Sequence, residues 1–230
     1  MTTSPASCAN PDDVQLVAAN LAEVHRRIRD AGADPSRIAV VAVTKTFGLT
    51  MVRAAAALGL TSMGENYVEE LEEKRHDTSE LALHWHYLGS LQSNKINRIV
   101  RSADVISGVS REKEILKIAA AREGAIIDVQ IDLTREAQRN GCEESEVPHL
   151  VHVAREAGLD VRGLMTVASP DAFTAAGQFA RVNELAGELG LRGRSMGMSD
   201  DVEIAVSHGS TEIRVGRALF GPRVHPTALT

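Results

Sequence analysis

Short runs of β-branched and aliphatic residues alternate with helical patterns along almost the whole chain. Eight such runs occur, and no two of them follow one another directly. This alternation predicts a parallel sheet, because two parallel strands need a crossover connection, which is usually a helix. The predicted strands are residues 38–44, a short segment ending at Gly64, and residues 84–89, 104–107, 125–131, 161–167, 194–198 and 212–216.

The stretches around these strands have the apolar periodicity of helices. Five apolar residues between Val14 and Ile28 recur at spacings of three and four, which marks one face of a helix from Asp12 to about Gly32. This helix precedes the first strand and is expected to cover the sheet. Further helices are predicted at residues 50–58, 65–76, 92–100, 111–122, 146–157, 171–189 and 200–207.

Eight strand–helix units in 230 residues favour a single (β/α)8 barrel of the TIM type with an extra N-terminal helix. An open, doubly wound sheet is the structural alternative, but it would leave edge strands that a closed barrel does not have. No Gly-, Pro- or Ser-rich linker divides the chain, so residues 12–230 are predicted to form one domain. The polar residues 1–11 are predicted to be a flexible tail.

The composition excludes several classes of protein. Lys and Arg total 25 against 31 Asp and Glu, and this net charge of −6 disfavours a basic surface for nucleic acid. No apolar stretch reaches membrane-spanning length, and the first residues lack a signal-peptide pattern. The two cysteines predict neither a disulfide framework nor a metal cluster. We therefore expect a cytoplasmic protein that binds neither nucleic acid nor membrane.

Lys45 follows the first predicted strand, at the end where barrel proteins carry their active sites. Because side chains alternate along a strand, Lys45 shares a face with Val41 and Val43, and its amine is expected above aliphatic groups. Partial desolvation lowers the pKa of a lysine and frees the amine to form a Schiff base with a carbonyl. On position alone, an exposed lysine at a strand exit is the better interpretation.

Residues suited to holding a phosphate follow the last two predicted strands. Gly197 and Gly216 let the backbone approach an anion, Ser199 offers a hydroxyl, and the amides of Gly216 and Arg217 can open a helix toward it. Glycines at strand ends also serve turns alone. A reactive lysine and a phosphate cradle across one barrel mouth together predict a site for pyridoxal phosphate (PLP).

Five segments, in the same order along the chain, resemble those of a known family. They read VAVTKTFG, MGENYVEEL, WHYLGSLQSNKI, VRGLMTVASP and MGMSDDVEIAVSHGSTEIRVGRALFG. They are similar to the pyridoxal phosphate homeostasis protein family, which comprises single-domain relatives of the alanine racemase N-terminal barrel. The resemblance extends from about Asp12 to Gly221. It implies a (β/α)8 barrel that carries PLP as a Schiff base on Lys45.

The same resemblance assigns roles to the last strand. It implies that Arg214 faces the pyridine nitrogen of PLP, that the amides of Gly216 and Arg217 hold the phosphate, and that Ser199 lies beside them. A guanidinium stays protonated and can only donate, so it leaves the ring nitrogen unprotonated. The ring is then a weak electron sink, which disfavours transamination.

Three further residues match motif positions near the cofactor, and the resemblance implies only that they line the pocket: Asn66, His86 and Met165. The chain departs from the family pattern elsewhere. Residues 107–110 read SGVS where relatives carry a His-Ser-Val-Asp-like stretch. The segment 136–141 has arginine where a lysine is customary, and Phe47 stands where proline is usual.

These features predict a carrier that binds PLP reversibly and takes part in intracellular PLP homeostasis and delivery. The expected partners are the cofactor and PLP-dependent apo-enzymes, the expected oligomeric state is a monomer, and no robust catalytic turnover is expected. The alternative is a single-domain amino-acid racemase of low activity. In two-domain racemases the family pattern places a second base, a tyrosine, on an additional domain that has no counterpart in these 230 residues.

Other chemistries have weaker support. His84 and His86 share one strand face and suit a metal, but the other strand ends offer too few ligands. The dinucleotide glycine fingerprint and the phosphate-loop lysine motif are both missing. Ser110 and Lys113 match a Ser-x-x-Lys spacing that a helix cap explains. The charge run at residues 65–75 predicts an exposed helix face with i,i+4 pairs.

Overall fold

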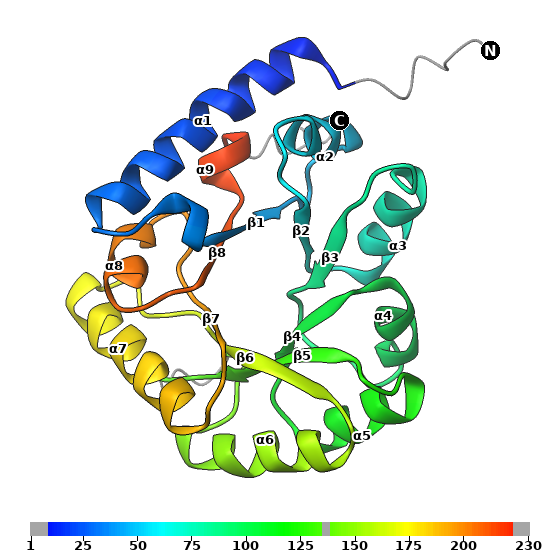
Figure 1. The fold of residues 1–230 in the computed structure, drawn as a ribbon. Coiled ribbons are helices and arrows are strands. Elements are labelled where there is room, and N and C mark those ends of the chain that lie inside the picture. Colours follow the sequence, from blue (N-terminus) through cyan, green and yellow to red (C-terminus); the bar gives the residue numbers. More distant parts are fainter. Residues whose placement is uncertain (1–8, 135–138, 223–230) are drawn as a thin grey trace, which may run out of the picture.

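The structure, a computed structural model, describes residues 9–134 and 139–222 and forms a closed barrel of parallel strands. Each strand pairs with the next along the chain, and β8 pairs with β1 to complete the ring (Figure 1). The prediction of a (β/α)8 barrel is therefore confirmed, and the open sheet is wrong. The strands are β1 (Ala39–Val43), β2 (Ser62–Glu65), β3 (His84–Tyr87), β4 (Val105–Val109), β5 (Ile126–Ile131), β6 (Asp160–Thr166), β7 (Gly193–Ser195) and β8 (Glu212–Val215).

Helices surround the ring of strands (Figure 1). Two short 3₁₀ helices, η2 (Pro35–Arg37) and η3 (Glu144–Glu146), precede β1 and α6. The α-helices are α1 (Pro11–Asp30), α2 (Leu49–Ala57), α3 (Val68–Asp77), α4 (Ile96–Ser102), α5 (Glu112–Ala121), α6 (Val147–Glu156), α7 (Ala172–Glu188), α8 (Val202–Ser207) and α9 (Arg217–Phe220).

The extra N-terminal helix α1 covers the side of the barrel that carries α8 and α9. Helix α9 has only four residues, and α1 packs against α2, α8 and α9 on that side (Figure 1). The Asn20 amide donates to the Leu219 carbonyl at 2.8 Å, which ties α1 to the end of α9. Of the predicted tail, residues 1–8 lie outside the described residues, and Pro11 already belongs to α1, whose N-cap is Asn10.

The barrel wall separates an aliphatic layer from a polar interior. Outward-facing strand residues such as Met63, Trp85 and Ile127 are fully buried beneath the helices. This burial is the main source of stability, at about 25 cal/mol per Å² of apolar surface removed from water. Val41 and Val43 are buried in β1, and the strands across the barrel contribute charged and polar side chains instead.

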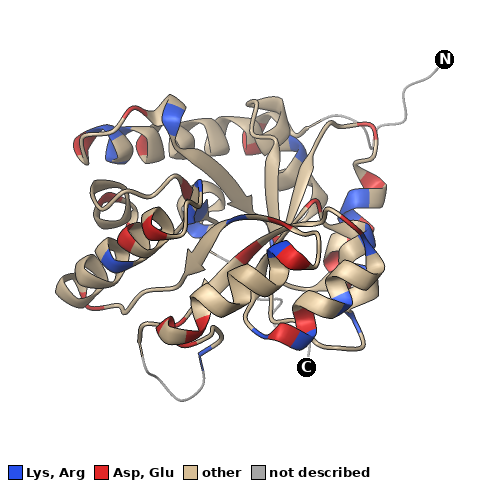
Figure 2. Ribbon diagram, turned by 60° about the horizontal axis from the view of Figure 1, so that its bottom comes forward, with Lys and Arg blue, Asp and Glu red and all other residues tan. Residues whose placement is uncertain are grey.

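The predicted exposed charge run at residues 65–75 is wrong in part. Helix α3 begins at Val68, and Glu65 belongs to β2, where it is fully buried. Lys74 is also buried, with 6% of its surface exposed, because it points from α3 toward Glu65. Elsewhere on the outer helices, acidic and basic residues are intermixed (Figure 2).

Candidate cofactor site at the barrel mouth

Lys45 lies in a tight turn directly after β1, half-buried at the carboxyl end of the strand. The Phe47 amide donates to the Thr44 carbonyl at 2.9 Å, and Thr46 has a φ of 65°. A turn with a positive φ only at its third residue is of type II, where glycine is the favoured residue. For a β-branched threonine this conformation costs about 1–2 kcal/mol. The turn that carries Lys45 is therefore strained.

The strand register brings the ends of β8, β1 and β2 together. Val43 pairs with Gly64, and the Thr44 amide donates to the Gly64 carbonyl at 2.9 Å. A Cβ atom on Gly216 would lie 3.0 Å from the Val43 carbonyl oxygen, so the backbones of β8 and β1 approach closely there. Lys45, Asn66 and Gly216 consequently stand at the same edge of the barrel.

Arg214 is buried inside the barrel and is held by three oxygen atoms. Its Nη1 donates to the carbonyl and the hydroxyl of Ser195, and its Nη2 donates to the Thr166 carbonyl at 2.7 Å. Burial lowers the pKa of the guanidinium, and the nearby carboxylates of Glu212 and Asp201 oppose this shift. The three oxygen atoms of Ser195 and Thr166 all accept from Arg214, as expected of a protonated guanidinium, which carries only N–H donors.

The loop after β7 wraps around the start of α9. Gly197 has a φ of 97°, which an L-residue adopts only with strain, and its carbonyl accepts from the Arg214 amide at 2.9 Å. The Ser199 hydroxyl accepts a hydrogen bond from the Ala218 amide at 3.1 Å. Arg217 is exposed and forms an ion pair with Asp200. The predicted phosphate residues thus lie together at the ends of β7 and β8.

The three predicted pocket-lining residues lie in or directly after three different strands and differ in their surroundings. Asn66 follows β2, and its Oδ1 is buried with no hydrogen-bond partner among the described residues. Met165 is buried in β6, where it pairs with Ser195 of β7, the residue that holds Arg214. The pocket-lining role of each remains a prediction.

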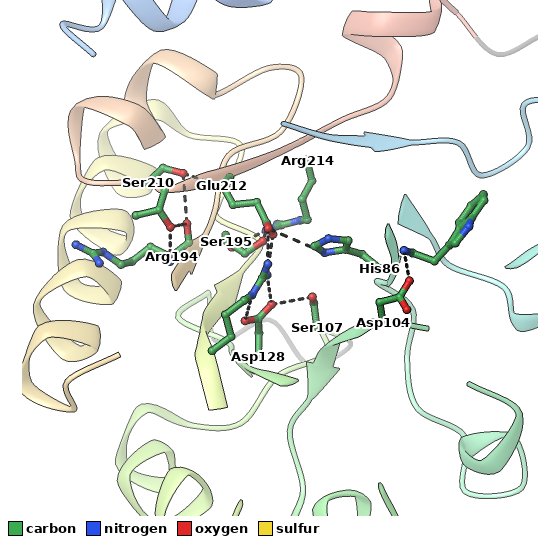
Figure 3. Close-up of polar contacts among 12 residues, drawn as sticks. His86, Asp104, Ser107, Asp128, Arg194, Ser195, Ser210, Glu212 and Arg214 are labelled. Carbon is green, nitrogen blue, oxygen red and sulfur yellow. Dashed lines mark hydrogen bonds and ion pairs between the residues drawn. The ribbon is translucent and has the colours of Figure 1, made fainter. Parts of the chain in front are cut away.

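His86 faces the interior of the barrel rather than its outer wall. Its Nδ1 is buried, has no hydrogen-bond partner among the described residues and lies 4.0 Å from Glu212 Oε2 (Figure 3). Burial lowers the pKa of the imidazole, although Glu212 opposes the shift. The ring is therefore neutral near pH 7.

An ionic network lies inside the barrel, closer than Arg214 to the amino ends of the strands. Sequence reasoning did not find it. Arg162 donates to both Asp128 oxygens and to both Glu212 oxygens, at distances from 2.5 to 2.9 Å. The Ser107 hydroxyl donates to Asp128 at 2.8 Å (Figure 3). Burial alone would raise the pKa of Glu212, but Arg162 holds it below the ordinary value. The sequence signal that could have indicated this network is the occurrence of single charged residues at inward positions of otherwise apolar strands.

The structure also bears on the metal-site hypothesis and on the segment after β5. His84 is exposed at the start of β3 while His86 is buried, and no group of three potential metal ligands occurs in residues 9–134 and 139–222. In the strand-five segment, Glu136 lies outside the described residues, and Arg139 donates to the carbonyls of Val167 and Ala168. Cys142 is buried.

None of the helices in the described ranges combines the length and the apolarity needed to cross a membrane.

Comparison with known proteins supports the sequence resemblance. Residues 13–224 match the family described as alanine racemase, N-terminal domain. The pyridoxal phosphate homeostasis protein of Pseudomonas aeruginosa is 38% identical over 223 residues, which cover 91% of this chain and 97% of that protein.

Two solved structures place the fold in context. PipY of Synechococcus elongatus, solved with PLP bound, is 32% identical with a TM-score of 0.75, and the match covers 89% of this chain and 100% of PipY. The alanine racemase of Streptomyces coelicolor is 20% identical with a TM-score of 0.72, and the match covers 93% of this chain but 59% of the racemase. The racemase therefore shares the barrel and extends well beyond it.

Proposed function

The chain belongs to the pyridoxal phosphate homeostasis protein family, within the alanine racemase N-terminal domain family, and we propose on this basis that it binds PLP as a Schiff base on Lys45. In this function it takes up the free cofactor, holds it reversibly in the cytoplasm and delivers it to PLP-dependent apo-enzymes. It acts as a monomer and without robust catalytic turnover.

The observation that carries this proposal is the position of Lys45 relative to the end of β8. PLP supplies an aldehyde that reacts with an amine, a ring nitrogen that accepts a hydrogen bond, and a phosphate dianion. Lys45 stands at the same barrel edge as Gly216, and Arg214 is the buried cation next to them on β8.

The residues present fit such a ligand. Described acceptors take up three of the five N–H groups of Arg214, which leaves donors for a ring nitrogen. The buried Oδ1 of Asn66 lacks a partner among the described residues, and a buried polar atom without one is costly unless a ligand or water supplies it. Ser199 and the close approach at Gly216 leave hydroxyl and backbone groups next to one another for the phosphate.

The test is the absorption spectrum of the purified protein after incubation with PLP. We expect a visible imine band, and after borohydride reduction mass spectrometry should locate the adduct on Lys45. The Lys45→Ala variant should lose both signals, whereas Lys113→Ala, which removes an exposed lysine of α5, should keep them. An adduct on another lysine, with Lys45 unmodified, would contradict the proposal.

Amino-acid racemisation is the alternative function, and it makes a different prediction. Arg214 would donate to the ring nitrogen of bound PLP instead of protonating it, which would weaken the ring as an electron sink. We expect negligible interconversion of D- and L-alanine or serine by the PLP-loaded protein. A turnover number of about 1 per second or more, typical of enzymes, would establish the racemase instead.

Delivery to apo-enzymes requires its own measurement. Loaded protein is mixed with a PLP-dependent apo-enzyme, and the recovery of that enzyme's activity is timed. Recovery faster than spontaneous release of PLP from the carrier, measured separately with a PLP scavenger, indicates direct transfer. Recovery at the release rate indicates that the protein only buffers free cofactor.

A further inference from the structure

A second lysine, Lys74 of α3, lies buried behind the strand that presents Lys45. Its Nζ donates to Glu65 Oε1 at 2.6 Å and to Glu70 Oε2 at 2.9 Å. Glu65 is the last residue of β2 and is fully buried on the outward face of the barrel wall, between the strands and α3. The ion pairs therefore lie outside the barrel interior and do not face the mouth.

These groups hold the turn of Lys45 at the residue on each side of it. Lys74 Nζ donates to the Thr44 carbonyl at 2.7 Å. The Thr44 hydroxyl donates to Glu65 at 2.6 Å, which fixes the same residue a second time. On the other side, the amide of the strained Thr46 donates to Glu70 at 2.9 Å.

The arrangement is expensive for a purely structural role. Burying an ion pair costs the hydration free energy of both charges. Their Coulombic attraction offsets this cost only when the remaining polar atoms also have hydrogen-bond partners. Glu65 Oε2 is buried and has no partner among the described residues. Apolar residues between β2 and α3 would fill the same space without that cost, so the pair is better explained by what it holds than by the stability it adds.

We propose that Lys74 is a positioning residue: with its two carboxylate partners it fixes the strained turn that presents the Lys45 amine to the cofactor. The inference rests on the proposed function, because Lys45 is the attachment point there. Lys74 itself faces away from the mouth and acts only through the backbone of the turn.

The first test measures Lys45 without any cofactor. The apo-protein is acetylated with limiting acetic anhydride, and peptide mass spectrometry gives the labelling of Lys45 relative to the exposed Lys113. In Glu70→Ala, whose altered side chain is partly exposed, release of the turn should raise this ratio at least threefold. Glu73→Ala, an exposed position on the same helix, should leave the ratio unchanged, and Glu70→Gln, which keeps an oxygen acceptor, should return it to within twofold of the unaltered protein.

The second test measures PLP binding by the same proteins. We expect Glu70→Ala to weaken PLP binding at least fivefold and to halve the induced circular dichroism per bound cofactor, while Glu73→Ala changes neither. Easier acetylation with poorer cofactor capture marks a change of orientation, because a gain in intrinsic amine reactivity would improve both. An altered circular dichroism per bound PLP reports the same change in the loaded protein.

A double variant tests Lys74 directly. Glu65→Gln combined with Lys74→Met removes both charges, so that no buried carboxylate is left without its cation. We expect the same pattern with at least a tenfold loss of PLP affinity. Should this variant fail to fold, the Glu70 series still decides the question.

An unchanged Lys45 to Lys113 labelling ratio in Glu70→Ala overturns the inference, whatever the protein does with PLP. A raised ratio in a protein that forms no adduct on Lys45 with PLP supports the positioning role and rejects the proposed function. The two claims therefore fail separately.

Discussion

The Phe47 ring packs against the Phe220 ring, with centroids 5.1 Å apart and the planes tilted by 50°. Phe47 closes the turn that carries Lys45, and Phe220 ends α9, the helix that begins after Gly216. The turn of Lys45, the predicted attachment point, and α9, which begins in the predicted phosphate-binding segment, are thus also joined by an aromatic contact.

Phe47→Ala should therefore loosen the amine side of the site against the phosphate side. An aromatic pair contributes about 0.5–1.5 kcal/mol beyond its buried area, which corresponds to a roughly twofold to twelvefold weaker PLP affinity in the variant if the whole contribution supports the site. Titration followed by imine absorbance measures this. Phe173→Ala removes a ring on α7 that is 90% exposed and should leave PLP binding unchanged. Equal affinities for Phe47→Ala and the unaltered protein would show that the contact does not support the site.

The barrel itself was predictable because its signal is local. Each strand is a short apolar run, and each helix carries its own periodicity, so a window of about ten residues decides the element. The predicted helix boundaries were less accurate where residues that favour caps and turns lie next to the helix. The helix predicted from residue 92 begins at Ile96, after Ser93 and Asn94, whose side chains favour turns over helix interiors.

The polar contacts were not predictable, because they join residues far apart in the chain. Arg162 meets Asp128 and Glu212, which lie 34 and 50 residues away from it. Lys74 and Glu70 do form the i,i+4 pair that the charge run indicated. Lys74 also pairs with Glu65 on the neighbouring strand, and this contact buries the Lys74 side chain. The periodicity within α3 does not predict a contact to another element.

The network of Arg162 should make stability depend on acid pH. Because the pKa of Glu212 in the folded protein is held below its ordinary value of 4.5, its ionised form stabilises the fold above that pH. This contribution is lost as the pH falls through the lowered folded pKa. We expect the free energy of unfolding, from urea titrations between pH 7 and pH 3, to decline below about pH 5.

Glu212→Gln should change that profile in two ways. At pH 7 the variant should be less stable by about 3 kcal/mol, because one partner of a buried charge network is removed. Its stability should also decline less steeply below pH 5, since the carboxyl that takes up the proton is gone. Parallel declines in both proteins would show that other carboxyl groups dominate the acid dependence.

Two glycine substitutions should have opposite effects on the free energy of unfolding. In Gly216→Ala, the added Cβ lies 3.0 Å from the Val43 carbonyl oxygen, which belongs to a strand and cannot move aside without shifting the turn of Lys45. Such overpacking typically costs about 1–3 kcal/mol, and PLP binding should weaken at least roughly threefold with it. Gly187 lies in the last turn of α7, where an added Cβ would meet no atom within 4 Å, so Gly187→Ala should add up to about 1 kcal/mol through helix propensity and leave PLP affinity unchanged. Urea unfolding and imine titration of both variants measure these effects. The comparison separates the close approach of β8 to β1 from the general effect of replacing a glycine. A Gly216→Ala protein with unaltered stability and affinity would show that this approach is not needed to hold the cofactor.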